Sequence, residues 1–513
     1  MDPVPAGPDE LAPSRVTMAM RVSAQAFADE EALVRIDALV AEHPDDVKLL
    51  FARACCLEDL ARYEQAKRGY SDVLTREPAN FGALTNLGSL LHMHGQRTVA
   101  RALYTKAVIE HPDEPMAYVN LGNSLLEDGD AAAAEAAYHA GLRVKADYPN
   151  LHFALSLLYR ENGDTDSALK HHQLAFVKPV VRVAPYFGAG PPVDVLLLLA
   201  AHGGNVVTHP FFDRRVVRLY TLVAEGYQPW LELPPHHVVF NGIGDVDRSL
   251  VPLRVAREIV ARSGKPVIND PEAVLASGRA SVTERLAQIP GVIAPRTIAL
   301  PRSAITAGEL AKRGFTFPLL LRSPGHHTGN HFAWVASPLA LDAVRETLPG
   351  IELLVIAYLD GRGPDEMYRK YRVLFIGGKL YPLHLAVSPR WKVHYFSADM
   401  ADRPDHRAEE AIFLSDMAAA IGAASVATLE QIAATLGLDY GGIDFGRDAA
   451  GNILLYEANA TMAVFPPPPD EHFDYRRAPV DRVITAVRQL VYDTGVRGGY
   501  VPHCHPELVE GQP

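Results

Sequence analysis

The first third of the chain repeats itself every 34 residues, and this period constrains the fold more than any other feature. Two series of small residues show the period, with successive members 34 positions apart. The first is Ala54, Gly88, Gly122 and Ser156, and the second is Ala66, Ala100, Ala134 and Ala168. Large side chains keep the same phase, and Pro44, Pro78 and Pro112 close successive units. A repeat of this length indicates supersecondary units that stack and share one continuous core.

Each unit contains two amphipathic stretches separated by a turn signal, which predicts a pair of packed helices. The spacing and residue types resemble the tetratricopeptide repeat family over about residues 47–182, and residues 27–43 resemble a capping helix. The resemblance implies an all-α solenoid whose concave groove binds a peptide or protein partner. An internal docking surface or a homodimer contact is the alternative use of the array.

Composition and charge narrow the class of protein. The chain has 513 residues, 48% hydrophobic residues and a net charge of −12, which predicts a globular protein of about three domains that does not gather nucleic acid or anionic lipid. No run reaches the roughly 20 apolar residues of a membrane span. Three cysteines and no leader pattern predict a reduced, cytoplasmic protein. The repeat histidines His92, His94, His171 and His172 are expected to be packing or surface residues.

The 34-residue period ends after the repeats. A segment rich in proline and glycine, residues 183–191, predicts a linker, and residues 1–26 predict a flexible N-terminal segment. Buried strands at 193–200 and 237–240 and a helix at 251–263 then predict a small open α/β domain over residues 192–300. We expect no dinucleotide site there, because the glycine-rich turn lacks the G-x-G-x-x-G pattern.

Residues 301–495 form a strand-rich segment that carries the chemistry. Strands at 317–321 and 331–335 flank a loop of small residues, and strands at 368–376 and 381–396 alternate polar and apolar side chains. Alternation with period two places the polar set on one sheet face. That set is Lys370, Arg372, His384, Ser388, Arg390, Lys392 and His394. It suggests a polyanionic ligand; a solvated outer face is the alternative.

A second hairpin supplies acidic and amide oxygens. Residues 441–446 and 453–460 predict its two strands, so that Glu457 and Asn459 share a face and Asp444 lies across from them. Carboxylate and amide oxygens are ligands suited to Mg²⁺.

The element Asp444…Glu457-Ala-Asn459, with the upstream loop and sheet, resembles the ATP-grasp superfamily of carboxylate–amine ligases over about residues 192–495. The implied architecture is a solenoid followed by an α/β domain (192–300), an ATP-grasp domain of two α+β subdomains (301–495) and a tail (496–513). The implied cofactors are ATP and two Mg²⁺ ions. The implied reaction joins a carboxylate to an amine through an acyl phosphate.

The resemblance also implies residue roles. Asp444, Glu457 and Asn459 would hold magnesium, and Arg372 would stabilise the transferring phosphoryl group, with Lys370 and Arg390 as weaker candidates. The implied ATP contacts are Arg322, Ser323, Gly325, His327, Gly329, Ile356, Tyr358 and Lys392.

Two departures concern the substrate. Arg322 stands where the family usually has lysine, and Gly442 stands where the D-alanine ligase type has arginine. A phosphotransferase acting on a hydroxyl, and a scaffold with a degenerate nucleotide site, are the rival interpretations. Cys504, between two histidines in the tail, is not expected to be a nucleophile or a metal ligand.

Overall fold

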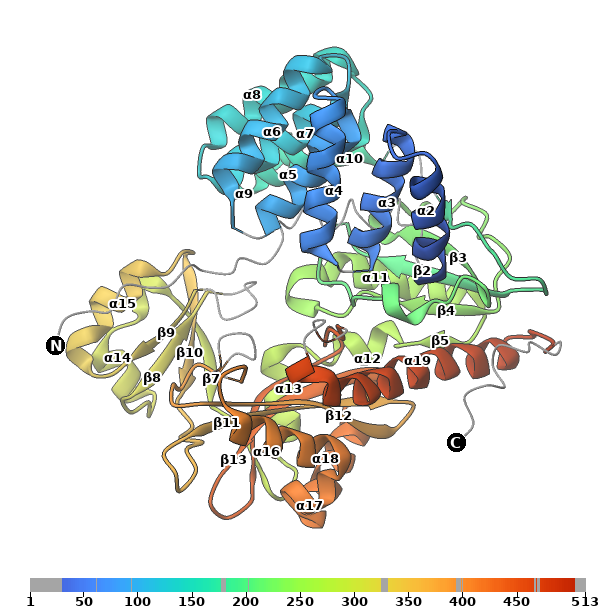
Figure 1. Ribbon diagram of the computed structural model, residues 1–513. Helices are drawn as coiled ribbons and strands as arrows, with labels where there is room; N and C mark the ends of the chain where they lie inside the picture. Colours follow the sequence, from blue (N-terminus) through green and yellow to red (C-terminus); the bar gives the residue numbers. More distant parts are fainter. Residues whose placement is uncertain are drawn as a thin grey trace. The chain divides into compact units, whose positions relative to one another are not determined.

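The computed structural model describes residues 30–60, 62–93, 95–176, 181–201, 203–323, 331–393, 398, 400–465, 467 and 471–502 (Figure 1). The chain divides between Pro179 and Val180 into two compact units, which are treated separately below. Among the described residues, no helix combines the length and the apolar character needed to cross a membrane.

The first unit is built from helices, as the 34-residue period predicts. Helix α2 (Glu30–Glu42) is followed by four helical pairs: α3 (Val47–Asp59) with α4 (Tyr63–Arg76), α5 (Phe81–Met93) with α6 (Arg97–Glu110), α7 (Pro115–Glu127) with α8 (Ala131–Val144), and α9 (Pro149–Glu161) with α10 (Thr165–Ala175). Gly95, Gly129 and Gly163, again 34 apart, adopt positive φ angles of 76°, 86° and 80° in the turns within pairs. Glycine takes this conformation without a steric cost.

Within each of the first three pairs, a side chain on the first helix contacts a tyrosine hydroxyl 15 residues later. The contacts join Cys55 to Tyr70 (3.4 Å), Ser89 to Tyr104 (3.2 Å) and Asn123 to Tyr138 (2.7 Å). The glycines of the repeat make room for these tyrosines, since a Cβ atom on Gly122 would lie 2.3 Å from the Tyr138 ring. This confirms that the small residues allow close packing of paired helices.

The second unit begins with a five-stranded sheet of order β1-β3-β2-β4-β5. Its strands are β1 (Val181–Val183), β2 (Val193–Leu199), β3 (Val217–Val223), β4 (Val238–Asn241) and β5 (Val267–Ile268). Strands β2 to β5 are parallel, and β1 pairs antiparallel with β3. Helix α11 (Val246–Ser263) and the short helices α12 (Pro271–Leu275) and α13 (Arg279–Leu286) follow β4 and β5. The open α/β arrangement was expected; β3 and the edge strand β1 were not.

A four-stranded antiparallel sheet of order β7-β10-β8-β9 comes next. Its strands are β7 (Thr297–Pro301), β8 (Leu319–Arg322), β9 (Phe332–Val335) and β10 (Glu352–Ala357), with helices α14 (Ala307–Lys312) and α15 (Leu341–Thr347) between them. The sheet and its helices share a core that includes Leu310, Leu321, Leu341 and Val355.

The third sheet has the order β12-β11-β13-β14-β6. Its strands are β6 (Val292–Ile293), β11 (Tyr368–Ile376), β12 (Lys379–Ser388), β13 (Tyr440–Arg447) and β14 (Ile453–Asn459), followed by η6 (Glu471–Arg476) and α19 (Arg477–Arg497). One face packs on α16 (Pro404–Ser415), α17 (Met417–Ile421) and α18 (Ala423–Leu436) through side chains such as Phe375 and Leu429. Part of the other face packs on α19 through Ile376 and Val487.

Strand β12 ends at Ser388 and not near residue 396, as the alternation had predicted. After Pro389, the Arg390 N–H donates to the Ser388 hydroxyl (3.1 Å) and not to a neighbouring strand, which gives the physical reason. Arg390 and Lys392 therefore lie outside the sheet, and His394 lies outside the described residues.

Asn269 connects the first and third sheets. Its side chain accepts from the Tyr440 N–H (2.8 Å) and donates to the Tyr440 carbonyl (2.8 Å), while its own N–H donates to Asp439 (2.8 Å). The residue is fully buried, with φ of 59°. Burial of the carboxyl raises the pKa of Asp439. The Asn269 side chain thus makes the two hydrogen bonds to Tyr440 that a paired backbone residue would make, and it links β5 to β13.

Candidate functional site

Four polar side chains form a row across neighbouring strands of the third sheet. His384 on β12 is opposite Arg372 on β11, Arg372 is opposite Asp444 on β13, and Asp444 is opposite Glu457 on β14. Residues directly opposite each other in antiparallel strands point to the same face. The sequence predicted that Asp444 lies across from Glu457, and the register has this pairing; that Arg372 lies beside them was not predicted. We call these four residues the charged row.

Asp444 is the centre of the row. Its carboxylate accepts two hydrogen bonds from the Arg372 guanidinium, at 2.6 and 2.8 Å, and lies 3.1 Å from the Lys370 ammonium. The Asp444 side chain is only 4% exposed. Burial alone would favour the neutral acid, but the charges of Arg372 and Lys370 hold the pKa of Asp444 far below its usual range. Asp444 is therefore an anion at every physiological pH.

The other two predicted magnesium ligands lie beside Asp444 on β14. Glu457 is half-buried, and its charge acts on Arg372, whose pKa is raised by its two acidic neighbours although burial opposes this. Asn459 is opposite Gly442, two positions from Glu457 on the same face. Its side-chain oxygen accepts hydrogen bonds from the Thr461 N–H (2.9 Å) and the Thr461 hydroxyl (3.0 Å).

At the β12 edge the row ends at His384, which the sequence pattern included, and is followed by buried polar groups that the sequence did not reveal. Burial, together with the Arg372 charge, lowers the pKa of His384 well below its usual value, so the ring is neutral. Arg476 from η6 also acts on His384 and lies 3.4 Å from the fully buried Glu410 of α16. Glu410 in turn accepts from the Leu385 N–H (3.2 Å) of the edge strand β12, and this hydrogen bond is buried. Nothing in the local pattern around Glu410 marks it as functional.

The residues predicted to contact ATP are only partly described. Arg322 ends β8 and lies over the Phe332 ring, 5.6 Å from its centroid. The buried Ser323 hydroxyl donates to the Pro349 carbonyl at 2.7 Å, which is a structural role. Ile356 pairs within the second sheet, and Tyr358 contacts Tyr368 through its hydroxyl (3.0 Å). Gly325, His327 and Gly329 lie outside the described residues.

Aromatic side chains join the second sheet to the segment after β12. Trp391 contacts Phe332 and Trp334, with ring centroids 5.3 and 5.6 Å apart, and Trp334 contacts Tyr358 at 4.5 Å. All four are half-buried. Sequence reasoning did not identify this group, although two of the chain's three tryptophans belong to it. Arg390 donates its backbone N–H to Ser388 (3.1 Å) and stands outside the row.

The donor set fits magnesium in its chemistry. Two carboxylates and one amide oxygen lie on adjacent positions of one sheet face, and these are the hard oxygen donors that Mg²⁺ takes. No group of three histidine, cysteine or acidic side chains placed to hold a metal occurs in the described part of the chain. The cations that neutralise Asp444 are also the groups that would neutralise phosphate oxygens.

Comparison with known proteins identifies the repeats. A family model for the tetratricopeptide repeat matches residues 51–115 and 119–175. Among solved structures, MamA from Desulfovibrio magneticus RS-1 is 20% identical and matches 32% of this chain and 95% of its own, with a TM-score of 0.27. TTC0263, a thermophilic TPR protein in Thermus thermophilus, is also 20% identical and matches 32% of this chain and 89% of its own, with a TM-score of 0.27. No curated protein gives a significant match.

The N-terminal region is thus a tetratricopeptide repeat array, as both the periodic geometry and the family model indicate. A mixed α/β region follows it.

Proposed function

We propose that the second unit is an ATP- and Mg²⁺-dependent carboxylate–amine ligase of the ATP-grasp type, and that the repeat array recruits a peptide or protein partner. The observation that supports this most is the charged row, where Asp444 and Glu457 face each other beside two cations. The order of the three sheets along the chain agrees with the architecture that the family resemblance implies.

In this proposal each side chain acts through charge and position. Bound magnesium would neutralise and orient phosphate oxygens, and Asp444, Glu457 and Asn459 would hold it. Arg372 and Lys370, which balance Asp444, would also face the charge that develops on the transferring phosphoryl group. A reaction through a small-molecule acyl phosphate requires no covalent attachment to a side chain of the row.

The carboxyl edge of the first sheet is the expected place for the acceptor substrates, since ligands of open parallel sheets bind at that edge. Gly244 follows β4 at this edge, and a Cβ atom there would lie 2.7 Å from the Thr461 side chain. Thr461 comes two residues after Asn459. The close approach therefore brings this edge next to the proposed magnesium ligands.

The repeat array supports the recruiting role. Stacked helical repeats present extended concave surfaces and commonly serve as protein-interaction scaffolds. A reaction on a large or carrier-bound substrate would benefit from such a surface in the same chain.

One observation favours a second candidate, a scaffold whose nucleotide site is degenerate. Both Asp444 oxygens are engaged by cations of the same sheet, and a buried ion pair can be purely structural. Under that reading Glu457 contributes nothing to turnover, which makes it the residue that separates the two candidates.

The test measures ADP release by the full chain with ATP, Mg²⁺ and pooled amino acids and peptides, with hydroxylamine as a general amine. An acyl phosphate gives a hydroxamate with hydroxylamine, whereas a phosphotransferase gives a stable phosphate ester. We expect Glu457→Gln to lower ADP release at least ~100-fold. The matched control is Glu352→Gln, at an exposed position on β10. ADP release that is equal in both variants would remove the ligase proposal.

A further inference from the structure

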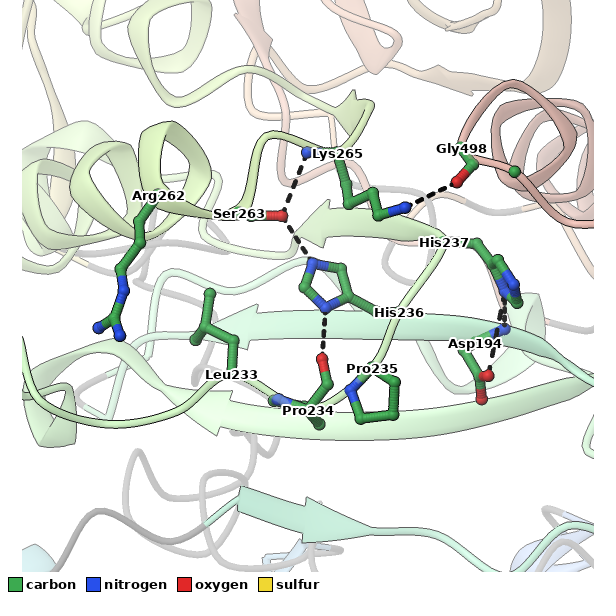
Figure 2. A pocket seen from close by; sticks show the side chains of 11 residues that line it. Asp194, Leu233, Pro234, Pro235, His236, His237, Arg262, Ser263, Lys265 and Gly498 are labelled. Atoms are coloured by element: carbon green, nitrogen blue, oxygen red, sulfur yellow. Dashed lines mark hydrogen bonds and ion pairs between the residues drawn. The ribbon is translucent and has the colours of Figure 1, made fainter.

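A cavity of about 490 Å³ lies at the amino edge of the first sheet, at the end opposite Gly244 (Figure 2). Its walls come from Asp194 at the start of β2, His236 and His237 before β4, Arg262 and Lys265 around the end of α11, and Gly498 after α19. Its volume lies within the range of small-molecule sites. None of these residues takes part in the proposed ligase chemistry.

The hydrogen-bond pattern fixes where the protons are on one side of the cavity. The Asp194 N–H donates to His237 Nδ1 at 2.9 Å, so Nδ1 is an acceptor and the proton of the neutral ring is on Nε2. Burial lowers the pKa of His237, which keeps the ring neutral at pH 7. His237 therefore contributes an N–H donor to the wall.

The proton positions on His236 follow in the same way. Its Nδ1 donates to the Pro234 carbonyl (2.7 Å), and its Nε2 accepts from the Ser263 hydroxyl (2.6 Å), so both ring nitrogens are engaged. Ser263 in turn accepts from the Lys265 N–H at 3.3 Å. Figure 2 shows this chain of bonds running through the middle of the cavity wall. The wall is thus ordered before any ligand binds.

The charges of the cavity do not balance. Asp194 is the acidic lining residue, and it is already held by the Arg218 guanidinium in two hydrogen bonds of 2.5 and 2.8 Å. Lys265 remains as a cation. The Arg262 guanidinium donates to the Tyr227 hydroxyl (3.0 Å) and to the Pro229 carbonyl, and Figure 2 shows Arg262 and Lys265 on separate parts of the wall. One of the three Lys265 ammonium hydrogens goes to the Gly498 carbonyl (3.0 Å), at the end of α19, where a cation is favoured. The cavity carries positive charge in a chain whose net charge is −12.

From this geometry we infer that the cavity binds a small multivalent anion, a phosphate ester or a polycarboxylate, through Lys265 and the His237 Nε2–H. Ordered donors and an unbalanced cation line one cavity of suitable volume, and Arg262 adds positive charge on another part of its wall. The inference does not rest on the proposed ligase function, because the cavity and the charged row lie on different sheets.

The test is isothermal titration calorimetry on the full chain with inorganic phosphate and, separately, with citrate. The two probes distinguish a phosphate site from a polycarboxylate site. We expect saturable binding of at least one anion, weakened at least tenfold by Lys265→Met. Lys379→Met, at the exposed β11–β12 turn, is the control and is expected to leave the affinity unchanged. Lys370→Met, beside the charged row, shows whether the anion binds there instead.

Two results would overturn the inference. One is the absence of saturable heat with both anions; the other is binding that Lys370→Met abolishes and Lys265→Met does not, which would move the anion to the charged row. Tryptophan fluorescence checks the fold of each variant. If Lys265→Met is not folded, Lys265→Gln takes its place, with the same tenfold loss expected and unchanged affinity counting against the inference.

Discussion

Asp444 and Glu457 lie opposite each other on neighbouring strands, but their surroundings give them different importance for the stability of the sheet. Asp444 is buried and neutralised by Arg372 and Lys370, whereas Glu457 is half-buried at the side of the row. Removing one member of a buried ion pair leaves its partner charged in a medium of low polarity. The two acidic residues should therefore differ in their effect on stability, whatever they do in catalysis.

We predict that Asp444→Asn lowers the free energy of unfolding by about 3 kcal/mol, and that Glu457→Gln lowers it by less than about 1 kcal/mol. Urea unfolding followed by tryptophan fluorescence measures this, because Trp230, Trp334 and Trp391 all belong to the second unit. Equal stability of the two variants would show that the Arg372–Asp444 pair does not support the sheet.

Asn269 gives a second prediction at the scale of one residue. Asn269→Ala removes both hydrogen bonds from the side-chain amide to the Tyr440 backbone and leaves those buried backbone groups without partners. We therefore expect the free energy of unfolding to fall by about 3 kcal/mol in the same experiment. Asn80→Ala, in the repeat array, is the control and should leave the tryptophan transition in place. An unchanged midpoint for Asn269→Ala would mean that the amide does not join the two sheets.

At the scale of the element, the last helical pair contains a cluster of imidazoles. His152 Nε2 donates to the Ala146 carbonyl (2.8 Å), so its Nδ1 accepts from His171 Nδ1 at 3.0 Å. His139 lies nearby and contacts the Tyr159 hydroxyl, which donates to Glu135. Burial and the neighbouring histidines, with Lys170, lower the pKa of His171 to about 4.

This pKa predicts how the pair α9–α10 responds to acid. An unfolded histidine titrates near 6.5, so between pH 6.5 and 4 the unfolded state binds more protons than the folded state. The stabilisation from neutral His171 is complete above pH 6.5 and is lost as the pH falls through 4. Hydrogen exchange of residues 149–176, corrected for intrinsic rates, should show this loss of protection, and His171→Phe should flatten it. A pH response that persists in His171→Phe would contradict the assignment.

The elements also show how far the sequence could predict the fold. The repeats were predictable because their period is local, and β11, β13 and β14 were predictable because alternation and turn residues mark them. Strand β3 (Val217–Val223) was missed although its β-branched and aromatic residues are typical of a strand. The end of β12 was misplaced because the alternation of polar and apolar residues continues past Ser388, whereas the Arg390 N–H turns back to the Ser388 hydroxyl.

The site was predictable only where its residues lie close in sequence or follow a motif. Asp444, Glu457 and Asn459 belong to one hairpin, so pattern and register agree. Glu410 and Arg476 reach the row from a helix and a 3-10 turn, and Asn269 meets Tyr440 across 171 positions. Such contacts depend on tertiary packing, which no local pattern encodes.

At the scale of the whole molecule, the described apolar residues group into separate cores. Those of the repeats lie before residue 180, and those of the three sheets lie after it. A compact unit with its own core can fold alone. We therefore predict that residues 1–179 and 180–513, produced separately, are each folded and cooperative in thermal unfolding followed by circular dichroism. Failure of either piece to fold would show that the two units depend on each other.

We propose that the charged row binds ATP through a divalent cation. The most direct measurement is equilibrium binding of a non-hydrolysable ATP analogue to the full chain, with and without Mg²⁺. We expect the analogue to bind only with Mg²⁺, and we expect Glu457→Gln to abolish this binding and Glu352→Gln to preserve it. No binding by the wild type, or binding that neither Mg²⁺ nor Glu457→Gln changes, would contradict it.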